Sequence, residues 1–149
     1  LIGVDIGRLL NEIIAQYPEF QSPHAEIVVP ASLPRVRGHE GSLTQCCSNL
    51  LSNAIKFVPP GVTPSVVVRA EPRGAQVRLW FEDNGIGIDE SFRDKIFKMF
   101  EKAHGRDRYE GTGIGLAIVR KAVERMGGEV GVESAPGAGS RFWIQLPQG

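Results

Sequence analysis

Apolar residues three or four positions apart, the period of a helix, mark four stretches of the chain. Residues 9–14 predict a first helix that ends before Pro18, and residues 40–57 predict a long helix that the sequence VPPG ends. A third helix is predicted for ESFRDKIFKMF, residues 90–100. In the fourth, which ends at one of the two glycines 127–128, the apolar stripe consists of Leu116, Val119, Val123 and Met126.

Alternating apolar and polar residues, or short apolar runs, predict strands between these helices. The predicted strands are AEIVVP, LPRVRG, SVVVRA, QVRLWFED, EVGVES and SRFWIQL. The turns EPRG and APGAG would join the middle pair and the last pair into hairpins. In QVRLWFED, one side carries Val77, Leu79 and Phe81, and the other carries Arg78, Trp80 and Glu82. We therefore predict an α+β fold, a two-layer sandwich in which a mixed, mostly antiparallel sheet carries helices on one face.

The composition describes a single globular domain over residues 1–149. Hydrophobic residues make up 42% of the chain and charged residues 23%, which suffices for an ordinary core. Because 17 basic residues balance 17 acidic ones, charge favours neither nucleic acid nor an anionic membrane as partner. No apolar run approaches the roughly 20 residues of a membrane helix, and no signal peptide is visible. The abrupt start LIGVDIGRLL suggests a piece of a longer protein.

The two cysteines, Cys46 and Cys47, are adjacent, so we expect no disulfide between them. A chain without a disulfide framework fits a reducing, cytoplasmic setting, and a membrane anchor on the parent protein is compatible with this.

The sequence GTGIGLAIVRKAVERMGG, residues 111–128, places three glycines directly before a predicted helix. It is not a Walker loop, because no lysine follows Gly115, and it lacks the third glycine and preceding strand of a dinucleotide fingerprint. Glycines still allow close backbone approach to a ligand, and the first N–H groups of a helix favour an anion. Taken alone, the segment is equally a flexible loop before a surface helix.

A second glycine-rich segment, DNGIG, begins at Asp83, where a predicted strand ends. A hairpin turn is one interpretation, because Asp, Asn and Gly are favoured in such turns. A helical segment follows instead of a strand, which favours another interpretation. Asp83 would then be a carboxylate at the edge of the sheet, beside which Gly85 and Gly87 leave room for a flat ligand. Such an acceptor suits an exocyclic amine like that of adenine.

The long helix 40–57 has a polar stripe made of Gln45, Asn49, Asn53 and Lys56. A solvated surface is the ordinary explanation of such a stripe. Amide oxygens can instead coordinate Mg²⁺, amide N–H groups can donate to phosphate, and lysine supplies a compact positive charge. The choice between the two interpretations depends on the rest of the chain.

Together these motifs resemble the ATP-binding catalytic domain of sensor histidine kinases, within the ATPase superfamily that includes gyrase, Hsp90 and MutL. NLLSNAIKF matches the N box of that family, DNGIGI its G1 box, FKMF its F box and GTGIGLAI its G2 box. GAGSRFWIQLP is similar to its closing strand. The motifs occur in family order over residues 39–147. The resemblance implies the Bergerat fold, with ATP bound between helices beneath a lid.

The resemblance also implies roles for individual residues. Asp83 would bond the adenine amine, Asn49 and Asn53 would serve Mg²⁺ and the phosphates, and Lys56 a phosphate oxygen. Asn49 would be the metal ligand, and Asn49 and Lys56 the catalytic residues. The lid would be residues 101–110. The nucleotide-binding set is Asn49, Asn53, Lys56, Phe57, Asp83, Gly85, Gly87, Ile88, Phe97, Arg106, Gly111, Thr112, Gly113, Ile114, Gly115 and Leu116.

One position separates kinases from hydrolases in this superfamily. Members that resemble gyrase or Hsp90 carry a glutamate, the general base for water, where this chain has Asn49. An amide cannot accept that proton, so we expect a kinase domain with little turnover alone. A gyrase-like or Hsp90-like ATPase and a degenerate binding module remain the alternatives. The chain also departs from the family pattern at His39, where an aspartate is frequent, and at Ser42, where an arginine is frequent.

The partners follow from the resemblance. They are ATP, a histidine-bearing dimerisation domain of the same kinase, and the receiver domain of a response regulator. The dimerisation and sensor domains would lie upstream of Leu1, because His24, His39 and His104 do not resemble the family's phosphoacceptor segment. The piece would be a monomer and the whole protein a homodimer.

Overall fold

The structure is a computed structural model that describes residues 1–87, 114–134 and 137–149. The predicted helix 90–100 and the predicted lid 101–110 lie outside the described residues. The elements in chain order are β1 (Ile2–Asp5), α1 (Ile6–Gln16), the short 3-10 helix η1 (Pro18–Phe20), β2 (Glu26–Val28), β3 (Arg35–Gly38), α2 (Glu40–Lys56), β4 (Ser65–Arg73), β5 (Gln76–Asp83), α3 (Ile114–Arg125), β6 (Glu129–Ser134) and β7 (Ser140–Pro147).

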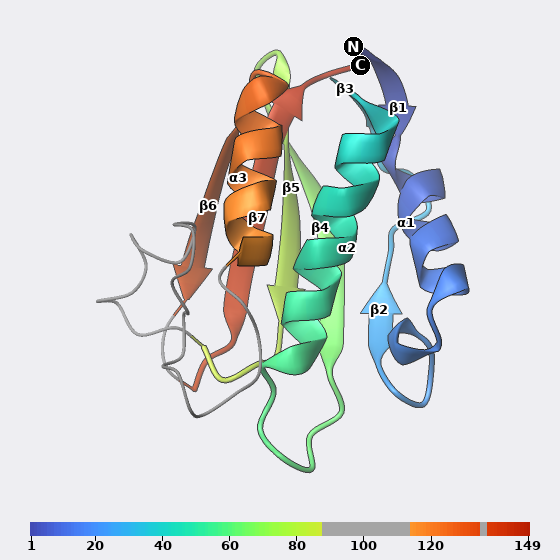
Figure 1. The fold of residues 1–149 in the computed structure, drawn as a ribbon, viewed down its shortest axis with the longest axis vertical. Helices are drawn as coiled ribbons and strands as arrows, with labels where there is room; N and C mark the ends of the chain where they lie inside the picture. The colour runs from blue at the N-terminus through green and yellow to red at the C-terminus, as the bar shows by residue number, and fades with distance from the viewer. Residues whose placement is uncertain (88–113, 135–136) are drawn as a thin grey trace.

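A five-stranded sheet forms one layer, with strand order β2-β4-β5-β7-β6. Strand β2 runs parallel to β4, and the other neighbours are antiparallel. Helices α1, α2 and α3 cover one face of this sheet (Figure 1). The predicted two-layer α+β fold with a mixed sheet is therefore confirmed. A separate two-stranded sheet pairs β1 with β3, and the sequence analysis did not predict β1.

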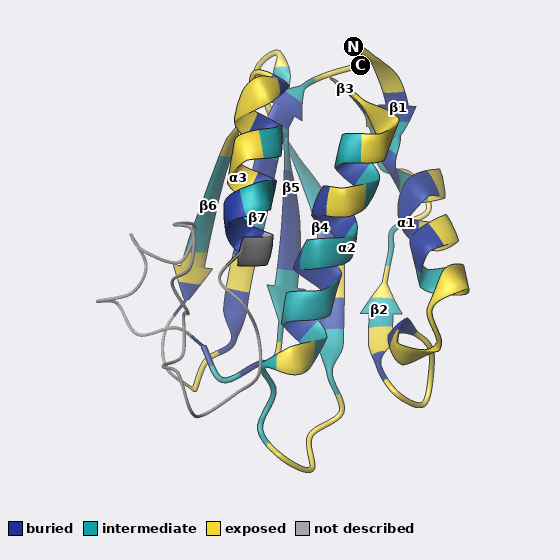
Figure 2. Ribbon diagram, in the orientation of Figure 1, coloured by how far each residue is buried: buried dark blue, intermediate teal, exposed yellow. Residues whose placement is uncertain are grey.

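The core lies between the helices and the sheet, and Figure 2 marks buried residues along the central strands and along the helices. Successive residues of a strand point to opposite faces, so alternate ones belong to the core. On β5 the inward residues are Val77, Leu79 and Phe81, as predicted, and each is at most 3% exposed. The predicted stripe of α3 is confirmed as well, since Leu116, Val119, Val123 and Met126 are all buried. Burial of these side chains is the main favourable term that holds the layers together.

None of the described helices covers the opposite face of the sheet (Figure 1), yet Trp80 is only 5% exposed there. Arg69 and Arg141 lie over its ring, with guanidinium carbons 4.9 and 5.3 Å from the ring centroid. Arg78 stacks on the neighbouring Trp143 at 3.6 Å. The apolar-polar alternation of β5 predicts that Trp80 is exposed to solvent. The stacked arginines bury it instead.

The turn of the β4–β5 hairpin differs from the predicted EPRG. Strand β4 continues to Arg73, and the turn is Gly74–Ala75, with Gly74 at φ 65°. A two-residue turn with positive φ matches the twist of the flanking strands, and glycine adopts it without strain. Strand β2 pairs only with residues 65–67 of β4, so the rest of β4 is an edge strand in the described part of the chain. Pro72 fits there because an edge position needs no N–H donor on its open side.

Helices α2 and α3 are antiparallel, so the end of α2 and the start of α3 lie at one end of the molecule (Figure 1). Helix α3 stops at Gly127, whose φ of 84° suits glycine, and Gly128 N–H donates to the Val123 carbonyl over 2.9 Å. Helix α2 begins at Glu40, and the side chain of its N-cap residue, His39, makes no capping hydrogen bond. None of the helices in the described part of the chain has the length and apolarity needed to span a bilayer.

Candidate functional site

The segment 83–87 leaves β5 and crosses to the end of α2. Asn84 exchanges hydrogen bonds with Ser65, and its side-chain amide donates to the Thr63 carbonyl over 3.0 Å. The N–H of Ile86 donates to the Phe57 carbonyl over 2.8 Å. The Asp-Asn-Gly sequence is therefore a tethered crossing, and the hairpin interpretation is wrong.

Asp83 is held at the start of this crossing by backbone donors. Its Oδ1 atom accepts from the N–H of Gly85 at 2.9 Å and from the N–H of Ser140 at 3.1 Å. Burial raises the pKa of Asp83 to about 6, and these two hydrogen bonds only partly oppose that effect. Its Oδ2 atom accepts no hydrogen bond from the part of the chain that the structure describes. A second acceptor oxygen therefore remains available to a ligand.

Asp83 lines a narrow cleft of about 20 Å³. The three predicted motifs each contribute to its walls: Asn53 and Phe57 from α2, Asp83 and Gly87 from the crossing, and Leu116 from α3. Strand β7 completes the lining with Ser140 and Phe142. A half-buried acceptor among mainly apolar walls suits a flat ring that carries a donor group.

Gly85 is needed for backbone packing and does not line the cleft. A Cβ atom at this position would clash with the Phe57 carbonyl oxygen, so the missing side chain lets the crossing meet the end of α2. Gly87, by contrast, lines the cleft and has a positive φ of 79°. The sequence analysis placed both Gly85 and Gly87 beside a flat ligand. Of the two, only Gly87 lines the cleft.

Two predicted residues lie on α2 without lining the cleft. Asn49 is half-buried one turn before Asn53, and Lys56 is exposed at the last position of the helix. Gln45, from the same polar stripe, lines a different hollow between α2 and α3. Six predicted residues lie outside the described residues, namely Ile88, Phe97, Arg106, Gly111, Thr112 and Gly113, and of Ile114 and Gly115 only the backbone at the start of α3 is described.

The sequence analysis did not single out the contribution of β7. Register places Ser140 opposite Asp83, and Phe142 follows on the same face. Ser140 is fixed in turn by Ser134 on β6, whose hydroxyl lies 2.8 Å from the Ser140 hydroxyl and donates to the Gly139 carbonyl over 2.9 Å. A polar serine at the start of an apolar strand was the available signal in the sequence. Its contact with Asp83 depends on the pairing of β7 with β5, which are far apart in the sequence.

The family model described as histidine kinase-, DNA gyrase B- and HSP90-like ATPase matches residues 38–149, most of the chain. The chain belongs to this family. Within it, the chain is an ATP-binding catalytic domain of the histidine kinase type, as the relatives and solved structures below indicate.

Two curated relatives illustrate the similarity. The chain is 36% identical over 150 residues to the phytochrome-like protein Cph1 of Synechocystis sp., covering 100% of this chain and 20% of Cph1. It is 46% identical over 116 residues to the sensor histidine kinase AruS of Pseudomonas aeruginosa, covering 74% of this chain and 11% of AruS. The chain thus spans a fifth or less of the length of these relatives.

Solved structures show the same fold. The mycobacterial sensor histidine kinase MprB superposes with a TM-score of 0.84 at 28% identity, covering 99% of this chain and 98% of that one. Full-length ShkA, solved in complex with AMPPNP, superposes with a TM-score of 0.80 at 34% identity, covering 99% of this chain and 31% of ShkA.

Proposed function

We propose that this domain binds Mg-ATP in the cleft at Asp83 and presents the γ-phosphate to a histidine on a separate dimerisation domain. The observation that carries the proposal is the half-satisfied carboxylate of Asp83. One of its oxygens accepts from two backbone N–H groups, the other accepts from none of the described residues, and Asp83 lines the cleft. An ATP analogue bound to the related ShkA supports the choice of nucleotide.

Adenine recognition would rest on Asp83 Oδ2, which accepts a hydrogen bond from the exocyclic amine. Phe57, Leu116 and Phe142 supply apolar surface for the faces and edges of the base. Gly87 allows the base to approach the backbone. A guanine base carries a carbonyl where adenine carries the amine, so two acceptors would oppose each other and GTP would be disfavoured.

The triphosphate would extend from the adenine site along the end of α2. Asn53 lines the cleft there, and Lys56 is an exposed cation one turn on, without an ion pair to any described residue. The amide oxygens of Asn49 and Asn53 fit Mg²⁺, which prefers hard oxygen ligands and keeps several waters. The metal would neutralise phosphate charge, while these side chains hold the γ-phosphate in position.

Asn49, and the chemistry of the described cleft residues, favour phosphoryl transfer over hydrolysis. Among the described residues that line the cleft, Asp83 is the only acid, and it is assigned to the base of the nucleotide. Asn49 cannot take a proton from water. ATP would therefore stay intact until the histidine of a dimerisation domain arrives, and a receiver domain would accept the phosphoryl group afterwards.

Phosphorylation in trans tests this proposal. The domain is mixed with γ-labelled ATP, Mg²⁺ and a supplied histidine-bearing dimerisation domain, and label on that domain is followed with time. We expect transfer that needs Mg²⁺ and is strongly reduced by Asn49→Asp, while Glu82→Gln, on the other face of the sheet, serves as control. Release of free phosphate faster than transfer would instead assign a hydrolase, and absence of ATP binding would assign a degenerate module.

A further inference from the structure

A second concave surface lies between α2 and α3, at the end of these antiparallel helices away from the nucleotide cleft. This groove, of about 430 Å³, shares none of its described lining residues with the cleft. One wall is the first half of α2, with Ser42 and Gln45. The other wall is the second half of α3. It therefore forms a site of its own on the same pair of helices.

The floor of the groove is apolar. Ile118, Ala122 and Met126 follow one another at four-residue intervals, so they form one stripe along α3. Met126 closes the end of the stripe, where its sulfur accepts from the N–H of His39 at 3.4 Å. Ile118 and Ala122 are only half-buried, so part of the stripe is open to a partner.

The rim of the groove is basic. Lys121 and Arg125 are exposed and lie one helical turn apart on α3, about 6 Å along its axis. Neither makes a hydrogen bond or an ion pair with any residue that the structure describes, and no Asp or Glu is among the described residues that line the groove. By contrast, Arg120 on another side of the same helix is paired with Glu124 at 3.3 Å.

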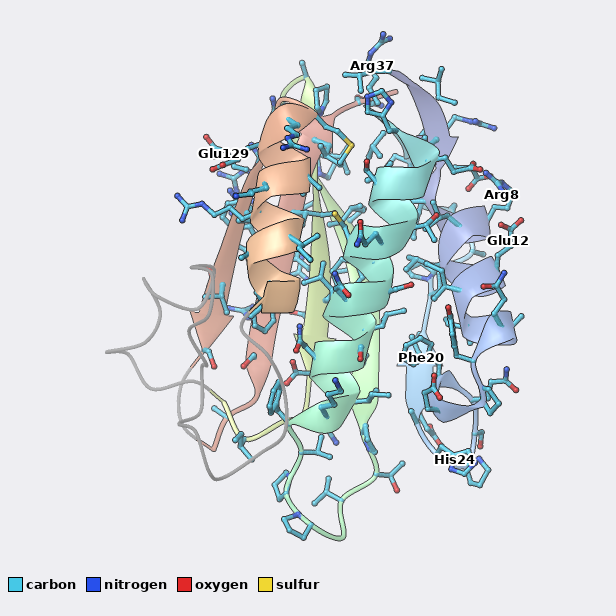
Figure 3. The ribbon with its side chains drawn as sticks, in the orientation of Figure 1. Arg8, Glu12, Phe20, His24, Arg37 and Glu129 are labelled. Atoms are coloured by element: carbon cyan, nitrogen blue, oxygen red, sulfur yellow. The ribbon has the colours of Figure 1, made fainter. Side chains whose placement is uncertain are left out.

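Acidic residues near the groove are already paired or lie on another side of α3 (Figure 3). Arg37, two residues before His39, points outward at the end of the molecule where α2 begins (Figure 3). Glu129 lies on the other side of α3, away from α2 (Figure 3). Glu40, the nearest acid on α2, is already paired with Arg8. The cations of the groove are therefore not neutralised within the described chain.

We propose that this groove is a docking site for an acidic amphipathic helix of a partner protein. Carboxylates four residues apart on such a helix match the spacing of Lys121 and Arg125, and an apolar side chain between them would cover Ile118 and Ala122. A small anion would leave the apolar floor bare. Nucleic acid needs a longer basic track than these cations provide, and the chain as a whole has no net charge.

The test uses a synthetic helical peptide of about 18 residues, with glutamates four positions apart and leucine between them. Amide chemical shifts of the labelled 149-residue chain are followed during titration, without nucleotide. We expect saturable shifts centred on residues 39–45 and 118–126. The matched peptide with glutamine in place of glutamate, and a duplex DNA of similar length, should bind at least about tenfold more weakly.

Two variants distinguish binding in the groove from a general effect of surface charge on peptide binding. The double change Lys121→Glu with Arg125→Glu should weaken peptide binding about tenfold or more, whereas Arg120→Glu on the same helix should leave it within about twofold. Both should bind ATP as the parent chain does, so failure of this inference is distinct from failure of the nucleotide proposal. Four results would each overturn the inference. Two concern the peptide: no saturable shift at about 1 mM, or equal effects of the two variants on its binding. The other two are tighter binding of DNA than of the peptide, and concentration-dependent self-association of the chain through the same groove.

Discussion

Asp83→Asn is expected to stabilise the free protein and weaken its binding of ATP. Burial raises the pKa of Asp83 from an ordinary 3.8 to about 6, so the folded chain holds this proton more tightly than the unfolded chain. At roughly 1.4 kcal/mol per pH unit, the ionised carboxylate costs the folded state about 3 kcal/mol at pH 7. A neutral amide avoids this cost, and its oxygen still accepts from Gly85 and Ser140.

The same variant should bind ATP poorly, because the geometry leaves its amide no good orientation. If the amide oxygen keeps the two backbone N–H groups, the NH₂ group faces the cleft, where the adenine amine is also a donor. Loss of a hydrogen bond to a charged acceptor costs about 1.5–3 kcal/mol, which corresponds to roughly 10- to 150-fold in the dissociation constant. Higher stability together with lower affinity would show that the carboxylate is retained for the ligand.

Two measurements check this prediction. Urea unfolding at pH 4–8 gives the free energy of unfolding of both proteins. As the pH rises from about 4 to about 6, this free energy should fall in the parent protein by comparison with the variant, because only the parent releases a proton from this site. Calorimetric titration with Mg-ATP gives the affinity. Glu82→Gln, a carboxyl-to-amide change on the open face of the sheet, is the control and should leave ATP affinity within about twofold. An Asp83→Asn protein that binds ATP normally, or is less stable than the parent at pH 7, would refute the reasoning.

Three further expectations concern stability and reactivity. Gly85→Ala should lower the free energy of unfolding by about 1–3 kcal/mol in urea titrations, because the new methyl group meets the Phe57 carbonyl; an unchanged midpoint would contradict the close approach. His39→Ser should raise it by about 0.5–1 kcal/mol through a new N-cap bond to α2, and no gain would argue against the observed helix start. Cys46 and Cys47 should react with a thiol reagent only after unfolding, because burial raises both pKa values, that of Cys46 to about 11; rapid labelling of the native protein at pH 8 would count against this.

Local patterns in the sequence were enough to predict the layers of this domain. The stripe of α3 and the alternation of β5 depend only on residues a few positions apart, and burial confirms both. The helix stop at Gly127 follows from the φ angle that glycine alone adopts easily. Four motifs in the expected order also indicated the family, which the family model matching residues 38–149 confirms.

The tertiary structure decided which residues surround the cleft. Ser140 donates to Asp83 across 57 positions of sequence, through the pairing of β7 with β5, and such a register leaves no local trace. The polar stripe of α2 looked continuous, but Asn53 lines the cleft beside the start of α3, and Gln45 lines the groove beside the end of α3. Gly85 is required by the Phe57 carbonyl, a contact between segments that only the packed chain brings together. Side-chain period is a property of neighbouring residues, whereas the shape and charge of a site depend on which distant segments pack against one another.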